Sequence, residues 1–262
     1  MKLLNGSELA DYIKERQAWQ VRALKVRPKL AIVLTIDHPA INVYIRKKEA
    51  YGADLGIDVD IHKIKQNDAA NVIRKLNEDP SVSGIIVQLP LEDPSQTEAI
   101  VNLVAPEKDV DALGTKAKFE PATPMAILWL LNGYNVELQG KKVLLIGRGK
   151  LVGAPLEKIL KNSGVDVTVV ERGVEDLASH TKKADVIVTA TGSPAILRPD
   201  MIKHAAVIVD AGVASEEGKT VGDLDPEVYN RQDLTITPEK GGVGPLTVCA
   251  LFENVIRAAQ NQ

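Results

Sequence analysis

Four polar residues in the first half of the chain have side chains suited to proton transfer or ligand binding. Tyr44 and Lys48 lie four residues apart in 41–56, a segment with helical spacing, so they share one face of the predicted helix. Gln88 ends the otherwise apolar run GIIVQL, and Asp111 lies in the loop sequence KDVD. A lysine transfers protons near neutral pH only where burial or a neighbouring cation lowers its pKa.

Lys48, Gln88 and Asp111 also have ordinary structural explanations. Lys48 adjoins Arg46 and Lys47, and a solvated basic patch accounts for all three. Gln88 is equally an end cap for its strand, and the two aspartates of KDVD suit simple turn chemistry. Residue spacing alone does not show that the four segments meet.

The second half of the chain contains a glycine-rich loop in the sequence LLIGRGKLVGAP. The apolar run 142–146 predicts a buried strand, and 154–164 has apolar residues at helical spacing. A strand, a glycine turn and a helix let the backbone approach a pyrophosphate at the helix N-terminus. The spacing G-x-G-x-x-x-G is one residue longer than the common fingerprint, and a tight turn that binds nothing also fits it. The loop residues are Gly147, Arg148, Gly149 and Gly153.

The remaining segments predict an α/β protein with two lobes. Further strands are expected at 165–171, 184–192, 205–212 and 234–238, and their ends place Thr191, Gly192 and Gly212 at the edge where doubly wound sheets bind ligands. In the first half, strands are expected at 29–35, 59–65 and 83–91. Helices are expected at 41–56, 67–79, 97–104, 121–134 and 245–259, with a first helix that has Ser7 as its N-cap.

These elements predict a first domain from 1–118 plus 245–262 and a Rossmann-like domain with a doubly wound parallel sheet from 119–244. Two α/β lobes in series imply a cleft between them, where a substrate commonly binds.

The composition gives no indication of nucleic acid or membrane partners. The chain has 262 residues, of which 45% are hydrophobic and 26% charged, and its formal net charge is −3. No apolar run reaches the length of a membrane span, and the N-terminus lacks the apolar core of a signal peptide. The single cysteine, Cys249, excludes an intramolecular disulfide and fits a reducing cytoplasm.

Seven segments in order resemble those of one family, the bifunctional methylenetetrahydrofolate dehydrogenase/methenyltetrahydrofolate cyclohydrolases. They are HPAINVYIRKK, GIIVQLPLE, PEKDVDAL, PATP, GRGKLVGAP, VGDLD and ITPEKGGVGPLTV. Each segment is weak evidence alone, whereas together they cover nearly the whole chain. The resemblance implies that the chain oxidises 5,10-methylenetetrahydrofolate with NAD(P) and hydrolyses the methenyl product to 10-formyltetrahydrofolate. It also implies a homodimer and makes the first domain the folate-binding, catalytic one.

The resemblance assigns roles to individual residues. Lys48 is expected to be the catalytic lysine, Tyr44 its partner on the same helix face, and Gln88 its hydrogen-bond partner. Asp111 is expected to hold the pterin ring, with Tyr44, Gln88 and Pro245 also at the substrate. The residues expected at the dinucleotide are Gly147, Arg148, Gly149, Gly153, Glu171, Arg172, Thr191, Gly192, Gly212 and Gly242.

The chain departs from the family pattern at several positions, and one departure bears on the choice of coenzyme. Gly149 replaces a serine, and Ala112 replaces a glycine. Glu171 ends the second strand of the Rossmann-like domain, where a carboxylate favours the ribose 2′-hydroxyl of NAD. Arg148 and Arg172 suit a 2′-phosphate instead, and two arginines against one glutamate favour NADP, with NAD still possible.

Two other classes of function fit part of the sequence. A different two-domain dehydrogenase, of the shikimate- or amino-acid-dehydrogenase type, shares the glycine loop but does not require VQLPL, KDVD and GGVGP together. A non-catalytic dinucleotide-binding regulator need not keep Tyr44, Lys48, Gln88 and Asp111, so their presence counts against it.

Overall fold

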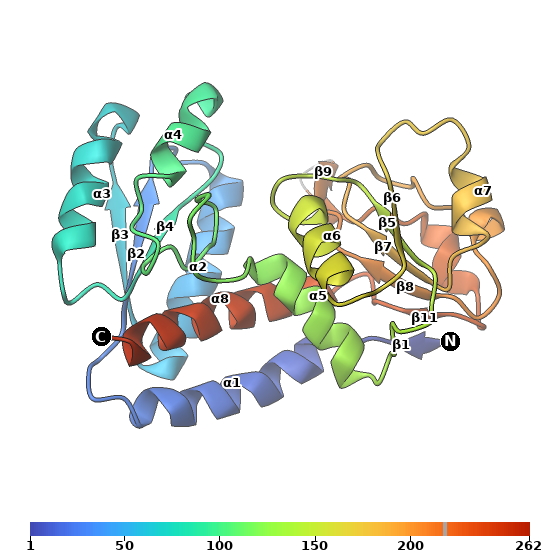
Figure 1. Ribbon diagram of the computed structural model, residues 1–262, viewed down its shortest axis with the longest axis horizontal. Helices are drawn as coiled ribbons and strands as arrows, with labels where there is room; N and C mark the ends of the chain where they lie inside the picture. The colour runs from blue at the N-terminus through green and yellow to red at the C-terminus, as the bar shows by residue number, and fades with distance from the viewer. Residues whose placement is uncertain (217–218) are drawn as a thin grey trace. The chain divides into compact units, whose positions relative to one another are not determined.

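The computed structural model describes residues 1–216 and 219–262, which divide into two compact units (Figure 1). The large-sheet unit contains Met1–Ala10 and Thr123–Thr247, and the small-sheet unit contains Asp11–Ala122 and Val248–Gln262. The sequence placed the first ten residues in the other domain. They group with the large sheet because strand β1 (Lys2–Leu3) pairs with β11 (Thr235–Ile236).

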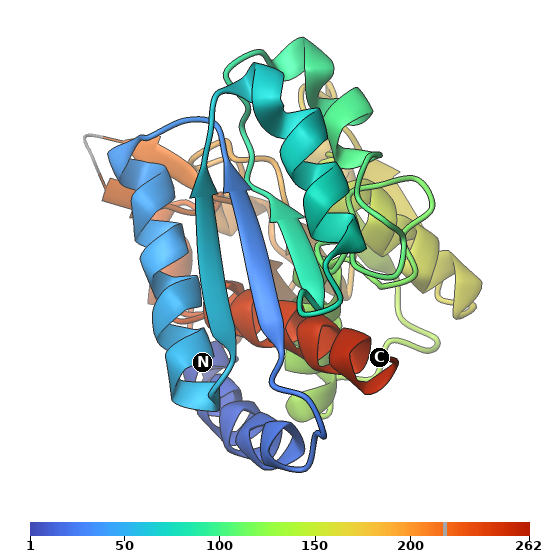
Figure 2. The same ribbon diagram turned by 90° about the vertical axis from the view of Figure 1, so that its left-hand side faces the viewer.

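The small-sheet unit is built on a parallel sheet of three strands. Its order is β3 (Asp58–Lys63), β2 (Lys29–Leu34) and β4 (Gly84–Val87). Helices α2 (Pro39–Leu55) and α3 (Ala69–Glu78) lie on opposite sides of it (Figures 1 and 2). The side chains of β2 alternate accordingly: Val33 packs in the cluster with α3, and Leu34 packs with α2.

Three short helical elements complete the small-sheet unit, and two long helices contribute residues to both units. The short elements are η1 (Gln66–Asp68), η2 (Pro94–Gln96) and α4 (Thr97–Val101). The boundaries between the units fall inside α1 (Gly6–Arg22) and α8 (Val243–Gln260), so each long helix supplies residues to both units.

The large-sheet unit is built on six parallel strands in the order β1, β11, β8, β7, β5 and β6. The central strands are apolar and buried on both faces, as covered parallel strands are. The predicted α/β class with a parallel second sheet is confirmed. Four of these strands are β5 (Val143–Ile146), β6 (Val167–Val170), β7 (Val186–Thr189) and β8 (Val207–Asp210). The helical elements of the unit are α5 (Ala122–Gly133), α6 (Gly153–Asn162), α7 (Leu177–Thr181), η3 (Pro199–Met201) and η4 (Pro226–Asn230).

The sequence prediction fails at several short features, among them α7, η3 and η4, which it does not include. It misses β1 and the antiparallel pair β9 (Ala214–Glu216) and β10 (Lys219–Val221), because two or three residues carry no readable period. Ser7 is not the N-cap of α1. The side chain of Asn5 accepts the Glu8 N–H at 3.3 Å, and the Ser7 N–H donates to the carbonyl of Gly241.

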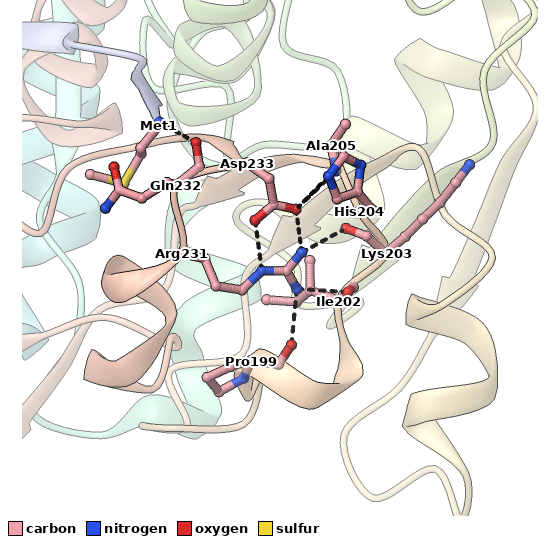
Figure 3. A network of polar contacts seen from close by, with 9 residues as sticks. All are labelled: Met1, Pro199, Ile202, Lys203, His204, Ala205, Arg231, Gln232 and Asp233. Carbon is pink, nitrogen blue, oxygen red and sulfur yellow. Dashed lines mark hydrogen bonds and ion pairs between the residues drawn. The ribbon is translucent and has the colours of Figure 1, made fainter.

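A polar network centred on Arg231 joins the segments that precede β8 and β11 (Figure 3). Its guanidinium forms two hydrogen bonds with the carboxylate of Asp233 and donates to the carbonyls of Pro199 and Ile202 at 3.0 and 2.7 Å. Asp233 also accepts the Ala205 N–H at 3.1 Å. The hydrogen bond from Arg231 is the main reason that the pKa of Asp233 lies well below its ordinary value.

We predict that Arg231→Met lowers the stability of the protein at pH 7. Because the pKa of Asp233 is depressed in the folded state, its contribution is present above the unfolded value of 3.8 and is lost as the pH falls below it. The stability difference between wild type and Arg231→Met therefore shrinks from pH 7 to pH 3 in urea unfolding. Arg198→Met, which removes an exposed ion pair with Asp200, is the control and has little effect. A difference that stays constant with pH would contradict this account.

Candidate functional site

The predicted lysine and glutamine meet in the small-sheet unit. Lys48 lies on α2, one turn beyond the buried Ile45, and its Nζ donates to Oε1 of Gln88 at 2.9 Å. Gln88 follows the last residue of β4, and two hydrogen bonds hold it in place. Its backbone N–H donates to the carbonyl of Val33, and its side-chain amide donates to the carbonyl of Leu89. The basic-patch explanation therefore fails for Lys48, although it suits the exposed Arg46 and Lys47.

Asp111 acts electrostatically on Lys48. Both residues are partly buried, and loss of solvent lowers the pKa of Lys48 and raises the pKa of Asp111. Each group opposes this effect in the other, because an ammonium and a carboxylate stabilise one another's charge. The lysine is therefore nearer to its neutral form at physiological pH than an exposed lysine is.

The two aspartates of KDVD have different roles. Asp109 is buried and accepts the backbone N–H of Gly114 at 2.8 Å, so the turn explanation is correct for it. Asn254 of α8 holds the same loop by donating to the carbonyl of Val110 at 2.9 Å. Ala112 has a φ of +56°, a conformation that costs a residue with a side chain about 1 kcal/mol. The glycine that the resemblance leads one to expect at this position would adopt the conformation without that cost.

Tyr44 stands apart from the lysine–glutamine pair. Its side chain is 44% exposed, and the ammonium of Lys47 lies 5.8 Å from its ring centroid. Within the described residues, no hydrogen bond joins Tyr44 to Lys48 or Gln88. Tyr44 and Lys48 thus lie four residues apart on α2, without a hydrogen bond between them in the described part of the chain.

Thr35 is a polar residue near this site that the sequence did not single out. It follows the last residue of β2, beside β4 and Gln88, and its buried hydroxyl has no hydrogen-bond partner among residues 1–216 and 219–262. The only signal in the sequence is a threonine at the end of an apolar run.

The glycine loop follows β5 in the large-sheet unit. Gly147 has a φ of +98°, and a Cβ there would lie 2.6 Å from the carbonyl oxygen of Ala190. A Cβ on Gly153 would lie 2.0 Å from the carbonyl oxygen of Gly147. Gly149, in contrast, has open space around it. The loop thus needs glycine at two positions and forms a backbone cradle at the N-terminus of α6, which suits a pyrophosphate.

A buried carboxylate holds the turn after β7. Asp223 is fully buried and accepts the backbone N–H and the hydroxyl of Thr191 at 2.7 and 2.9 Å, and the N–H of Ser193 at 2.9 Å. Gly212 is required here, because its Cβ would lie 2.1 Å from the Asp223 carboxyl carbon. The buried hydroxyl of Ser193 has no partner in the described part of the chain, so a polar ligand atom suits it.

A second carboxylate supports the first. Asp210, the last residue of β8, accepts the hydroxyl of Thr189 at 3.0 Å and the backbone N–H groups of Gly212 and Asp223 at 2.9 Å each. Burial raises the pKa of Asp210. No role was predicted for Asp210 or Asp223. Asp210 ends the apolar run in VIVDAG, where an acidic residue is unusual, and Asp223 lies in VGDLD, one of the segments that carry the family resemblance.

The backbone conformation defines the positions of three other predicted site residues, Gly192, Gly242 and Pro245. Gly192 has a φ of +63° in the turn held by Asp223. Gly242 is buried, and its carbonyl oxygen leaves no room for a Cβ on Gly6, which would lie 1.8 Å away. Pro245 lies in the first turn of α8 and belongs to the large-sheet unit, whereas the other predicted substrate residues belong to the small-sheet unit.

Arg148 has a partner that the sequence did not suggest. Its Nε donates to the carboxylate of Glu157 at 2.7 Å, and this hydrogen bond is the main cause that raises its pKa. Glu171, which the sequence analysis weighed against Arg148 as the residue that selects the coenzyme, raises the pKa of Arg148 by a smaller electrostatic effect. Glu171 and Arg172 are both exposed after β6.

Neither a metal centre nor a membrane-spanning helix is present in the described part of the chain. Residues 1–216 and 219–262 contain no group of three or more His, Cys, Asp or Glu that could hold a metal ion. No helix within the same ranges is long and apolar enough to cross a membrane.

Two family models match the chain and together cover most of it. The catalytic domain of tetrahydrofolate dehydrogenase/cyclohydrolase matches residues 4–111, and the NAD(P)-binding domain of the same family matches residues 121–262. The bifunctional protein FolD of Hydrogenobaculum sp. is 36% identical over 273 residues, which cover 98% of each chain.

Solved structures agree with these matches. The crystal structure of the bifunctional FolD methylenetetrahydrofolate dehydrogenase/cyclohydrolase from Campylobacter jejuni is 36% identical, with a TM-score of 0.94 over 100% of this chain and 99% of that one. The FolD enzyme of Trypanosoma brucei, solved with NADP and an inhibitor, is 28% identical, with a TM-score of 0.92 over 99% and 97% of the two chains. The chain described here belongs to the tetrahydrofolate dehydrogenase/cyclohydrolase family.

Proposed function

We propose that this chain oxidises 5,10-methylenetetrahydrofolate with NADP and hydrolyses the methenyl product to 10-formyltetrahydrofolate, with Lys48 as the proton-transfer residue of the hydrolysis. The observation that carries the proposal is a partly buried lysine, held by the amide oxygen of Gln88 and influenced by the carboxylate of Asp111, in the segment that matches the family's catalytic domain. The alternative of a different two-domain dehydrogenase is not favoured, because both family models match.

The residues of the large-sheet unit fit a dinucleotide. Gly147 and Gly153 leave the space for a pyrophosphate at the start of α6, and the unpartnered hydroxyl of Ser193 is available to the ligand. Arg148 and Arg172 suit the 2′-phosphate that distinguishes NADP from NAD. When bound, NADP supplies the acceptor for the hydride that leaves the methylene carbon. The NADP complex of the Trypanosoma brucei relative supports this choice of coenzyme.

Lys48 carries the proton chemistry of the hydrolysis. The methenyl carbon is cationic and open to water, and the neutral amine of Lys48 accepts a proton from the attacking water. The resulting ammonium returns a proton to the ring nitrogen as the carbon–nitrogen bond breaks, so the lysine ends the cycle as it began. The hydroxyl of the tetrahedral intermediate loses its proton to solvent as the formyl carbonyl forms, which releases the one proton of the overall hydrolysis. Gln88 accepts one N–H of the amine and thereby orients the group throughout.

Asp111, Tyr44 and Pro245 are assigned to the substrate. The carboxylate of Asp111 is an acceptor for the N–H donors of the pterin ring, and its charge favours a cationic methenyl group nearby. The exposed ring of Tyr44 lies on the same helix as Lys48 and is available for stacking. The substrate-binding role of Pro245 stays a prediction. The same holds for four other expectations from the sequence: the cleft, the homodimer, the absence of nucleic-acid partners and the cytoplasmic location.

The two activities are tested in one spectrophotometric assay with 5,10-methylenetetrahydrofolate. Reduced coenzyme and the methenyl compound are followed separately, with NADP and NAD in parallel. We expect reduction of NADP without lasting accumulation of the methenyl compound, and slower reduction of NAD. Absence of reduction with either coenzyme, in protein shown to be folded, would contradict the proposed function.

Lys48→Met is predicted to slow hydrolysis of the methenyl compound severely while the protein still folds and binds coenzyme. Loss of a general acid–base residue slows a reaction by about 10²- to 10⁴-fold. The fold tolerates the change because Met replaces a lysine whose charge is disfavoured by burial. Arg46→Met removes an exposed basic neighbour on the same helix and is the matched control, with hydrolysis near the wild-type rate. Near-normal hydrolysis by Lys48→Met would remove Lys48 from the mechanism.

Asp111→Asn is predicted to move the acidic limb of the hydrolysis pH profile to lower pH. The carboxylate of Asp111 raises the pKa of Lys48, so its removal lets that pKa fall further, and the neutral amine persists at lower pH. The profile of kcat at saturating methenyl substrate measures this shift. Glu49→Gln, which removes an exposed carboxylate next to Lys48 in sequence, leaves the limb in place. An unchanged limb in Asp111→Asn, or one at higher pH, would show that Asp111 does not control the lysine.

A further inference from the structure

Glu157 is a nearly buried carboxylate between two cations in the large-sheet unit. Its side chain is 10% exposed, while that of Arg148 is 54% exposed. One carboxylate oxygen accepts from Nε of Arg148 at 2.7 Å, and the other accepts from Nζ of Lys161 at 2.6 Å. Glu157 and Lys161 lie four residues apart on α6, so the helix itself fixes the carboxylate.

This contact determines which donors of Arg148 remain available. Because Glu157 occupies Nε, the two terminal nitrogens keep their four N–H groups, and neither has a protein acceptor among the residues that the structure describes. A guanidinium binds phosphate through such a fork of parallel N–H donors. Glu157 therefore holds the stem side of the guanidinium and leaves its phosphate-binding edge free.

The position of Arg148 fits the ribose end of a dinucleotide. Strands β5 and β6 pair with Ile146 opposite Val170, and the N–H of Gly147 donates to the carbonyl of Val170 at 2.9 Å. Arg148 thus follows β5 just beside the point where Glu171 and Arg172 follow β6. In sheets of this type, the residue after the second strand reads the ribose 2′ position.

We propose that Glu157 is a positioning residue for coenzyme selection, which holds Arg148 so that its free edge receives the 2′-phosphate of NADP. This inference rests on the proposed function, in which Arg148 contacts that phosphate. A long arginine side chain at an exposed position otherwise loses rotamer freedom on binding, and anchoring it in advance removes part of that cost.

The negative charge of Glu157 has an opposing effect, because it repels a phosphate. Lys161 offsets that charge at 2.6 Å, and the three side chains together carry one net positive charge. Anchoring therefore outweighs repulsion in this account. The two effects predict opposite results when Glu157 is removed, so an experiment separates them.

The test measures binding of adenosine 2′,5′-bisphosphate and adenosine 5′-monophosphate by calorimetry to the full-length protein. The ratio of the two dissociation constants reports recognition of the 2′-phosphate and does not depend on turnover. The variants are Glu157→Ala, Glu157→Gln, Arg148→Ala and the double variant Glu157→Ala with Arg148→Ala. Glu137→Gln removes an exposed carboxylate of the same unit, before β5, and is the matched control for the change in charge.

We expect Glu157→Ala to weaken the preference for the bisphosphate roughly three- to tenfold, the range for one long side chain that loses its anchor. Glu157→Gln keeps an acceptor for Nε and restores most of the preference, whereas Glu137→Gln leaves it unchanged. In the Arg148→Ala background, Glu157→Ala has no further effect on the ratio, because Glu157 acts through Arg148.

Three results would overturn the inference. A preference that increases in Glu157→Ala would mean that repulsion outweighs anchoring. An unchanged preference in Glu157→Ala, with a large loss in Arg148→Ala, would remove Glu157 and keep the proposed role of Arg148. An unchanged preference in Arg148→Ala would remove that role, and the inference with it. Thermal unfolding of each variant establishes that the protein used is folded.

Discussion

The chemistry of the small-sheet unit depends on the partial burial of Lys48. Loss of solvent favours the neutral amine, and the nearby carboxylate of Asp111 limits how far the pKa falls. The two effects act in opposite directions on the pKa of Lys48, and the proposed hydrolysis requires this lysine to accept a proton and then return it. The surrounding elements serve this balance: α2 carries the lysine, the end of β4 carries Gln88, and Asp109 and Asn254 fix the loop that carries Asp111.

In the large-sheet unit, the structural requirement is that the backbone comes close to a polyanion, and side chains at the glycine positions would prevent that approach. Gly147 and Gly153 leave that space, and no donor side chain is needed to form it. The adjacent turn is held from within the protein by Asp223, which Asp210 supports in turn. Burying two carboxylates costs free energy of desolvation, and the several hydrogen bonds that each accepts offset this cost. The same hydrogen bonds hold the turn in one conformation before a ligand binds.

Residues inside regular elements were predictable, and contacts between distant segments were not. The apolar runs of β5 and β7 and the helical spacing of α2 predict their elements, whereas β1 is too short for any period and is created by pairing with β11. Lys48 and Gln88 were predicted as partners only through the family resemblance, since forty residues separate them. The pair of Arg148 with Glu157 was missed, because nothing in the local sequence shows which way an arginine in a glycine loop points.

The proposed hydrolysis requires the pKa of Lys48 to lie below that of an ordinary lysine in the folded protein. Heteronuclear NMR of the lysine side chains across a pH titration measures this directly, with Lys48→Met to assign the signal. We expect a titration midpoint for Lys48 below its ordinary value of 10.5, because burial disfavours its charged form. A midpoint for Lys48 at or above 10.5 would contradict the proposed mechanism, because a permanently charged ammonium cannot accept the proton of the attacking water.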